Sequence, residues 1–396
     1  MTASEAYMPK EQISPSTSLQ STTHAVPYLQ GFFELIQVAI GKKKNLSHIP
    51  QKAEWRFIFY NTKRQTLVGV LFPAVKQLPK EQQPTAEILL PWLAYAERIQ
   101  AMNRKMNAEA IRIGEWLNQE GMDYTLLKGQ GIAIYYPQPL LRTPGDFDFW
   151  VAPHHAQHLS TAALRKEIVR FAESHGGVKS VYYHHLHFNC SQVSDVELHY
   201  FPSWNDNLWL NHHLQHFYHK AAPLQFIHTI KLPETSGTIH TPTREFNAFY
   251  LLLHIFRHLL TEGVGLRQLM DYYYVLHHDW DAETLRTIQH LIRKQHLTRF
   301  AKSVMYVMQQ VFGLEQQYWI VEPDEKEGRF LLKEIIRAGN FGQTDRRICQ
   351  HKNDSKMKRK FYSIVRTFSF ITHYPYTTFC NVCFRSIFFI HRKIGW

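Results

Sequence analysis

The sequence predicts an α+β fold in which a small mixed sheet is flanked by two helical segments. Apolar residues recur every three or four positions over residues 28–118 and again over residues 243–338, as they do in amphipathic helices. Between these stretches the pattern changes to short apolar runs that end at Gly and Pro, which is typical of strands. A chain of 396 residues is also too long for one ordinary core. We therefore expect two or three structural units.

Composition and periodicity divide the chain into five segments. The Ser/Thr-rich start and the basic, aromatic end differ most from the rest. The expected segments are residues 1–26 as a polar tail, 27–120 as a helical segment, 121–240 as an α/β core, 241–340 as a second helical segment and 341–396 as the basic aromatic segment.

Turn residues mark the elements of the expected core. Gly121 ends the preceding helix, because glycine readily adopts the backbone conformation that follows a helix C-terminus. The runs "YTLLKG" and "DFDFWV" are short, apolar and bounded by Gly or Pro, which predicts two strands separated by a brief helical turn at "GIAIYY". A helix is expected from His154 to Ser174. Two further strands are expected in "VKSVYYHHLHFNC" and "SDVELHYF".

Several classes of protein are disfavoured by the composition. No apolar run approaches the roughly 18–20 residues that a membrane-spanning helix needs. The start of the chain lacks the apolar stretch of a secretory signal. The four cysteines are too few for a disulfide framework, which fits a reducing compartment. These features predict a cytoplasmic protein without a transmembrane span.

Positive charge is concentrated at the C-terminal end. The formal net charge of the chain is +12, and residues 341–396 hold eleven Lys or Arg against two acids, so that they supply +9 of it. Cations interleaved with aromatic residues suit nucleic acid or an anionic membrane surface. The alternative is a solvated helix that packs against the body of the protein through its aromatic residues.

Two acids stand one residue apart in an apolar run. If "GDFDFWV" is a strand, Asp146 and Asp148 lie on one face, and the phenylalanines lie on the other. "SDVELHYF" has the same alternation and would bring Glu197 beside them on a neighbouring strand. Carboxylates held this close repel one another unless a cation lies between them. The pattern therefore predicts a site for two Mg²⁺ ions, with Mn²⁺ as an alternative.

The order of these motifs resembles a known group. "LLKGQG", "LLRTPGDFDFWV" and "VELHYF" are similar to the polymerase-beta-like nucleotidyltransferase superfamily, and specifically to its bacterial branch of uncharacterised nucleotidyltransferases. The resemblance extends over residues 28–338. It implies a small mixed-sheet nucleotidyltransferase core and an enzyme that transfers a nucleotidyl group from a nucleoside triphosphate, with AMP from ATP favoured. The acceptor is unknown.

The resemblance also assigns roles to individual residues. Catalysis and metal binding would fall to Asp146, Asp148 and Glu197, and nucleotide binding to Lys128, Gly129, Gly131, Arg142 and Arg267. The chain has Gly-Gln-Gly where the superfamily commonly has Gly-Ser or Gly-Gly. A hydroxyl is therefore absent, and Lys128 or backbone N–H groups would contact the triphosphate instead.

Each assignment has a simpler alternative. Arg142 would otherwise be a surface arginine before a turn, and Arg267 would form an ion pair with Asp271 four residues on. His254 and His258 have metal-ligand spacing on a helix, but histidines that line the nucleotide cleft are favoured over a zinc site, and core histidines are favoured over both.

The histidines of residues 184–187 are expected to alternate between faces, and a chain with 25 histidines has such clusters by chance. For the whole protein, the alternatives are a non-catalytic nucleotide-binding scaffold and a protein that binds RNA or a membrane surface through residues 341–396. Spacing alone would also allow phosphoryl transfer at the γ-phosphate.

Overall fold

The chain is organised as two compact units. The computed structural model describes residues 22–156, 159–350 and 354–394. The first unit comprises Met1–Lys63, Leu67–Pro202 and Ala221–Asn247, and the second comprises Arg64–Thr66, Ser203–Lys220 and Ala248–Trp396. The expected polar tail lies outside the described residues as far as residue 21. The division into five segments stays a prediction.

The first unit holds both sheets and the N-terminal helices. The N-terminal helices were expected from the periodicity, and they are followed by strands where the period changes. The elements are α1 (Thr22–Ala39), α2 (Lys52–Arg64), α3 (Val68–Gln77), η2 (Lys80–Gln82), α4 (Ala86–Gln119), β1 (Met122–Leu127), α5 (Gln130–Ala133), η3 (Pro139–Leu141), β2 (Phe147–Pro153), α6 (Thr161–Ser174), β3 (Val178–Val181), β4 (His185–Phe188), β5 (Val196–His199), β6 (Thr229–Lys231) and β7 (Thr238–His240).

The main sheet is mixed, as the sequence predicts. Its strand order is β1-β2-β5-β4-β3. β2 and β5 run parallel, whereas the other neighbouring pairs are antiparallel. Every residue of β2 is buried, so both faces of the sheet are covered there. A separate two-stranded ribbon is formed by β6 and β7.

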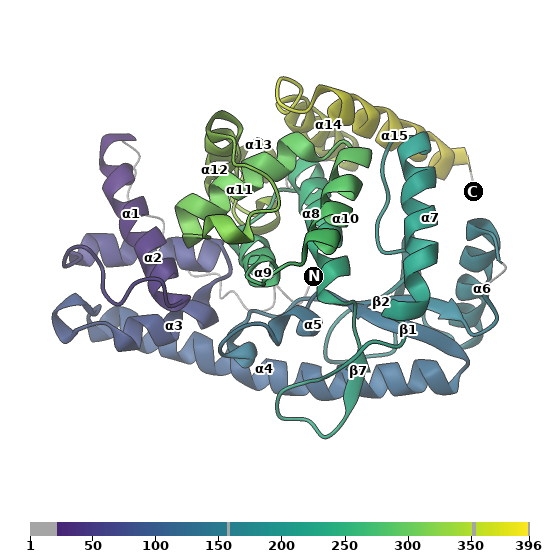
Figure 1. Ribbon diagram of the computed structural model, residues 1–396, viewed down its shortest axis with the longest axis horizontal. Coiled ribbons are helices and arrows are strands. Elements are labelled where there is room, and N and C mark those ends of the chain that lie inside the picture. The colour runs from purple at the N-terminus through teal and green to yellow at the C-terminus, as the bar shows by residue number, and fades with distance from the viewer. Residues whose placement is uncertain (1–21, 157–158, 351–353, 395–396) are drawn as a thin grey trace. The chain divides into compact units, whose positions relative to one another are not determined.

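Alternation along β2 separates its apolar and acidic side chains. The rings of Phe147 and Phe149 contact each other, with centroids 6.2 Å apart, and Tyr124 on β1 contacts Phe149. The long helix α4 packs against β1 and runs beneath β1 and β2 in the view of Figure 1. Asp148 and Trp150 point to the opposite face, where Trp150 packs on Phe226. Asp148 therefore lies on the face opposite Phe147 and Phe149, whereas Asp146, which was expected on the same strand, precedes β2.

Two sequence-based boundaries in this unit are wrong. The helix expected from His154 begins only at Thr161, where the Ser160 hydroxyl accepts a hydrogen bond from the N–H of Ala163 and caps the helix. The single strand expected in "VKSVYYHHLHFNC" is a hairpin of β3 and β4, joined through residues 182–184. That connection has no Gly, Pro, Asn or Asp, the residues that usually reveal a turn in sequence.

Gly69 allows α3 to approach the segment that leads into β2. A Cβ atom at Gly69 would overlap the backbone carbonyl oxygen of Leu141, which cannot swing away as a side-chain tip can. We expect Gly69→Ala to destabilise the protein by about 1–3 kcal/mol or more, through overpacking. Denaturant unfolding measures this effect. Gln77→Ala, an exposed change on the same helix, should stay within about 0.5 kcal/mol of the parent. Equal stability of the two variants would contradict the prediction.

The second unit is helical. Its elements are α7 (Leu208–Gln225), α8 (Arg244–Thr261), α9 (Leu266–Leu276), α10 (Ala282–Lys294), α11 (Thr298–Phe312), η5 (Gln316–Tyr318), α12 (Glu325–Ala338), η6 (Asn340–Gly342), α13 (Arg346–Cys349), α14 (Lys356–Phe368) and α15 (Pro375–Ile394), with the C-terminal part of α7 and the start of α8 falling in the first unit. Helices α11 and α12 pack against each other. No helix among the described residues is both long and apolar enough to cross a membrane.

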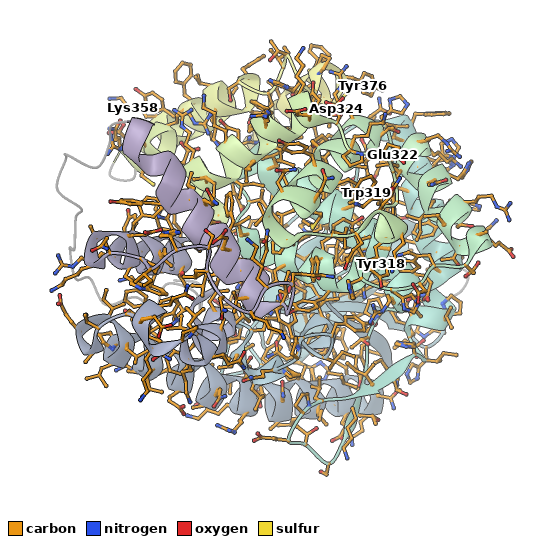
Figure 2. All side chains as sticks on the ribbon, turned by 60° about the vertical axis from the view of Figure 1, so that its left-hand side comes forward. Tyr318, Trp319, Glu322, Asp324, Lys358 and Tyr376 are labelled. Carbon is orange, nitrogen blue, oxygen red and sulfur yellow. The ribbon has the colours of Figure 1, made fainter. Side chains whose placement is uncertain are left out.

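The connection between α11 and α12 is rich in aromatic and acidic side chains. Figure 2 shows Tyr318 and Trp319 on it, with Glu322 and Asp324 further along. The Trp319 indole N–H donates to the carbonyl oxygen of Leu314 at 3.1 Å, and Asp324 caps α12. An open pocket of about 430 Å³ beside this connection is lined by Tyr306, Gln309, Gln310, Trp319, Glu322, Pro323, Glu325 and Arg329. It contains none of the residues predicted to bind metal or nucleotide.

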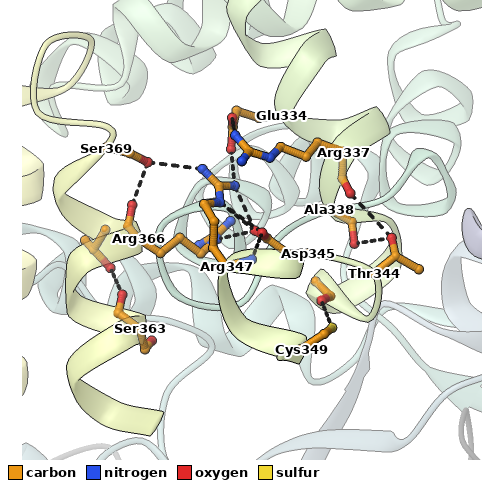
Figure 3. A network of polar contacts seen from close by, with 12 residues as sticks. Glu334, Arg337, Ala338, Thr344, Asp345, Arg347, Cys349, Ser363, Arg366 and Ser369 are labelled. Atoms are coloured by element: carbon orange, nitrogen blue, oxygen red, sulfur yellow. Dashed lines mark hydrogen bonds and ion pairs between the residues drawn. The ribbon is translucent and has the colours of Figure 1, made fainter. Parts of the chain in front are cut away.

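A buried ion network ties the basic C-terminal segment into the second unit (Figure 3). Asp345 and Arg366 are both fully buried, and the Arg366 Nε donates to Asp345 Oδ2 at 3.0 Å. Arg347 adds a second guanidinium to Asp345 at 2.7 Å and also pairs with Glu334 at 2.6 Å. Arg366 and Thr367 both donate to the carbonyl oxygen of Leu260. Part of the segment that looks basic in sequence is therefore interior.

Candidate active site

A sharp turn follows β1 at the predicted nucleotide-binding glycines. Lys128 and Gly129 both have positive φ, at 46° and 53°. The ψ of Gly129 is −122°, a combination that L-residues with a Cβ avoid. Around Gly129 the nearest atom to an added Cβ would be the carbonyl oxygen of Asp146 at 4.0 Å. Gly129 is therefore required by the backbone and borders the loop that carries Asp146.

The other two residues of the Gly-Gln-Gly turn face the interior. A Cβ at Gly131 would lie 2.9 Å from the Thr241 methyl, and the N–H of Gly131 donates to the carbonyl oxygen of Lys128 within the turn. Gln130 is buried and donates to Asn103 Oδ1 at 2.8 Å. The glutamine that departs from the superfamily pattern thus anchors the turn to α4, and the nucleotide contact predicted for Gly131 stays a prediction.

The Gln130–Asn103 contact gives a stability prediction. Gln130→Ala should cost about 1–3 kcal/mol, because the buried Asn103 oxygen is left without its donor. Chemical denaturation of the single variants and of the double variant with Asn103→Ala checks this. The double variant should cost less than the sum of the singles, since both remove the same contact. Additive effects would show that the two side chains do not depend on each other.

Asp148 is the most buried of the predicted metal ligands. It lies opposite Glu197 in the parallel pairing of β2 with β5, so both side chains project from the same face. Its Oδ2 lies 3.1 Å from the Lys128 Nζ, and its Oδ1 lies 3.0 Å from His199 Nε2. Burial alone would raise the pKa of Asp148, but Lys128 and His199 outweigh it and hold the pKa well below its usual range. Asp148 is therefore ionised at neutral pH.

His199 links Asp148 with Glu197. Its Nε2 lies 3.0 Å from Asp148 and 3.1 Å from Glu197 Oε2, and the donor atoms of the three residues all lie within 4.8 Å of one another. Burial lowers the pKa of the His199 imidazole, but hydrogen bonds to Asp148 and Glu197 outweigh it and raise the pKa overall. Strand pairing thus joins residues that are about fifty positions apart in sequence.

Asp146 stands just before β2 and carries an unsatisfied oxygen. Its Oδ1 is buried and accepts no hydrogen bond from the described residues. Burial, together with the charges of Asp148 and Glu197, raises the pKa of Asp146 to about 7. The carboxyl group thus lies near the charges of Asp148 and Glu197, and Lys128 only partly offsets their effect on its pKa. A bound cation would supply the missing partner.

Histidines that the sequence did not single out surround Glu197. His185 Nε2 lies 3.7 Å from Glu197 Oε2, and His187 Nε2 lies 3.6 Å from Glu197 Oε1. The His184 ring also joins the group, with its centroid 4.3 Å from that of His185. The expectation that these histidines diverge is wrong, because His184 precedes β4 and is not bound by strand alternation. His185 and His187 are two residues apart on one strand, and this spacing could have indicated that both project from the same face.

Both predicted arginines lie in the interior. Arg142 is 5% exposed and Asn103 binds its carbonyl oxygen at 2.8 Å, so the alternative of a surface arginine is wrong. Arg267 lies on α9 in the second unit, is 6% exposed and stands 5.7 Å over the ring of Phe341. The nucleotide-binding role of both arginines stays a prediction.

The donor set fits a divalent cation. Carboxylate oxygens are the ligands that Mg²⁺ and Mn²⁺ prefer, and Asp146 offers a buried oxygen without a partner. The groups of metal-capable side chains found among the described residues are built from Asp148, His184, His185, His187, Glu197 and His199. His254 and His258, the alternative helical pair, instead contact each other at 3.0 Å.

Comparison with known proteins assigns the chain to a family. No curated protein and no solved structure matches the chain. A family model described as uncharacterised nucleotidyltransferase matches residues 51–313, which include both strands with the acids and the turn after β1. The matched region covers well over half of the 396 residues, and the family is one of transferase enzymes. The chain therefore belongs to this family of uncharacterised nucleotidyltransferases.

Proposed function

We propose that the protein transfers a nucleotidyl group, with AMP from ATP as the favoured case, to an acceptor whose chemical class is open. The observation that carries the proposal is the register of β2 and β5, which sets Asp148 beside Glu197. Asp146, which has one buried oxygen without a hydrogen-bond partner among the described residues, would complete a set of three acids. Four free cysteines support a reducing compartment, and we place the protein in the cytoplasm.

The three acids would bind divalent cations, with two Mg²⁺ ions favoured and Mn²⁺ as an alternative. Such ions neutralise triphosphate charge and lower the pKa of an attacking hydroxyl. The acids and the triphosphate of a nucleotide are all negatively charged, so the acids alone would repel the nucleotide. Lys128, which reaches Asp148 from the turn, would add positive charge beside the phosphates. Gly129 would allow the backbone to approach them closely.

The chemistry of the proposed step is an in-line displacement. An acceptor oxygen forms a bond to the α-phosphorus of ATP, the bond to the bridging oxygen of the β-phosphate breaks, and pyrophosphate leaves with the electron pair. Glu197, which is 16% exposed, would accept the acceptor's proton. Lys128 and His199 hold the pKa of Asp148 well below its usual range, which makes Asp148 a weak base that is poorly suited to that role.

The test uses ATP labelled at two different positions. The full-length protein is incubated with a cell extract, Mg²⁺ and ATP labelled at either the α- or the γ-phosphate. Transfer of the α-label to an acceptor, with release of pyrophosphate, supports the proposal. Transfer of the γ-label alone would indicate phosphoryl transfer and overturn it. ATP binding without transfer of either label in any extract would favour the non-catalytic scaffold.

The double variant Asp146→Asn/Asp148→Asn serves as the inactive comparison. Its melting temperature is measured beside that of the parent, so that loss of labelling is not confused with loss of folding. Equal labelling of an acceptor by the folded variant and by the parent would show that these acids do not carry the reaction.

A further inference from the structure

A second donor set lies on the far side of Glu197 from Asp148. In the antiparallel pairing of β4 with β5, His187 stands opposite Glu197 and His185 stands opposite His199. Opposed residues of neighbouring strands project from the same face of the sheet. The two imidazoles therefore project beside the carboxylate because of the fold itself, and not through a mobile loop.

The distances in this set do not fit ordinary hydrogen bonds. Glu197 Oε2 lies 3.7 Å from His185 Nε2, and Glu197 Oε1 lies 3.6 Å from His187 Nε2. Hydrogen bonds between such atoms are typically about 2.7–3.2 Å long. An ion held tetrahedrally at about 2.1 Å from each donor places the donors about 3.4 Å apart, whereas octahedral neighbours would be about 3.0 Å apart. The two observed distances, each to a different oxygen of Glu197, are closer to the tetrahedral value.

The nitrogen of His185 is buried and unsatisfied. Its Nε2 has no hydrogen-bond partner among the residues that the structure describes, while its Nδ1 lies 3.1 Å from a ring nitrogen of His184. With the proton on Nδ1, where it can donate to His184, Nε2 carries the lone pair and points into the group. Metal-binding histidines are commonly oriented in this way by a partner on the other ring nitrogen. The donor atoms of His185, His187 and Glu197 all lie within 4.8 Å of one another.

We propose that His185, His187 and Glu197 form a binding site for a divalent transition-metal ion of the zinc type, separate from the acid set of Asp146 and Asp148. Imidazole nitrogen favours such ions over Mg²⁺, which prefers oxygen ligands. Three protein ligands leave the fourth tetrahedral position to solvent or substrate. Glu197 has two oxygens and belongs to both sets, so the second ion would lie beside the first site. The proposal does not depend on nucleotidyl transfer, because metal binding is measured without a nucleotide.

The first measurement is made on the parent protein. The full chain is stripped of metal with a chelator and titrated with Co²⁺, which absorbs visible light much more strongly in tetrahedral than in octahedral sites. One equivalent of strongly absorbing Co²⁺, displaced by Zn²⁺ but not by excess Mg²⁺, is the expected result. Weak octahedral bands, or displacement by Mg²⁺, would overturn the proposal without any variant.

Variants then locate the ion. His185→Asn and His187→Asn should each weaken Zn²⁺ binding at least about tenfold and remove the strong Co²⁺ bands. His154→Asn, which alters a half-exposed histidine at the opposite end of β2, should bind as the parent does. Melting temperatures measured without metal identify any variant that fails to fold. If a variant does not fold, the Co²⁺ spectrum of the parent protein remains as the test of the tetrahedral site. Unchanged binding in folded His185→Asn and His187→Asn would place the ion elsewhere and refute the site.

Discussion

Replacing Asp148 with asparagine is expected to lower kcat/KM for nucleotidyl transfer by more than about 100-fold. Changing a group that merely orients a metal ligand typically lowers metal affinity or activity 10–100-fold, and Asp148 is proposed as a ligand itself. Asparagine keeps the shape of the side chain but removes its charge. Lys128 and His199, which both contact Asp148, would then meet a neutral amide in a buried place. The measurement is the rate of α-label transfer from ATP with saturating Mg²⁺.

The matched control is Asp123→Asn. Asp123 lies on the neighbouring strand β1, is 43% exposed and pairs with His154 at 3.4 Å, so the same substitution there should leave the rate within about twofold of the parent. A folded Asp148→Asn variant that keeps the parent rate would contradict the assignment. So would an equal loss in Asp123→Asn.

Asp345→Asn is expected to destabilise the protein by about 3–5 kcal/mol, the cost of removing one partner from a buried ion pair. Arg366 would keep its charge in a fully buried position, where the carbonyl oxygen of Leu260 also accepts a hydrogen bond from it. Guanidinium-induced unfolding measures the change. The double variant Asp345→Asn/Arg366→Met should lose less than Asp345→Asn alone, because no buried charge is then left unpaired. The exposed change Asp279→Asn should stay within about 0.5 kcal/mol of the parent.

The same ion network predicts how stability depends on pH. Burial would raise the pKa of Asp345, but Arg347 and Arg366 outweigh it and lower the pKa below its ordinary value of 3.8. A carboxyl group whose pKa is lower in the folded state than in the unfolded state stabilises the protein at pH values above the unfolded-state pKa. This contribution is lost as the pH falls toward the folded-state pKa. Below about pH 4 the parent should therefore approach Asp345→Asn in stability. A constant difference down to pH 2 would show that the charge of Asp345 does not matter.

Local patterns were enough to predict the two strands that carry the acids, whereas the mixed sheet was implied by the family resemblance. Alternation in "DFDFWV" and "SDVELHYF" depends only on strand geometry, and the structure has β2 and β5 at those places. The direct pairing of Asp148 with Glu197 could not be derived in this way, because register depends on the whole sheet. The presence of two acid-bearing strands was therefore predictable, whereas their alignment was not.

The features that were missed depend on distant partners. Arg142 is interior because Asn103, 39 residues earlier on α4, binds its backbone. The histidines of β4 meet Glu197 only because residues 182–184 turn without the usual turn residues. Gln130 stands where the superfamily commonly has Ser or Gly, and its hydrogen bond to Asn103 on α4 gives this glutamine a structural role. In each case the missing information was a long-range contact and not a local preference.

The buried position of Arg366 changes how the basic end of the chain must be studied. Arg347 and Arg366 pair internally with Asp345, which the formal +9 already counts, and Arg347 also pairs with Glu334 outside the segment, so an external polyanion would meet a smaller field than +9 suggests. Truncation at residue 341 would remove Arg366 and Thr367 from Leu260 and damage the fold along with the surface. Charge reversal at exposed Lys358, seen on α14 in Figure 2, changes the surface and leaves this interior intact.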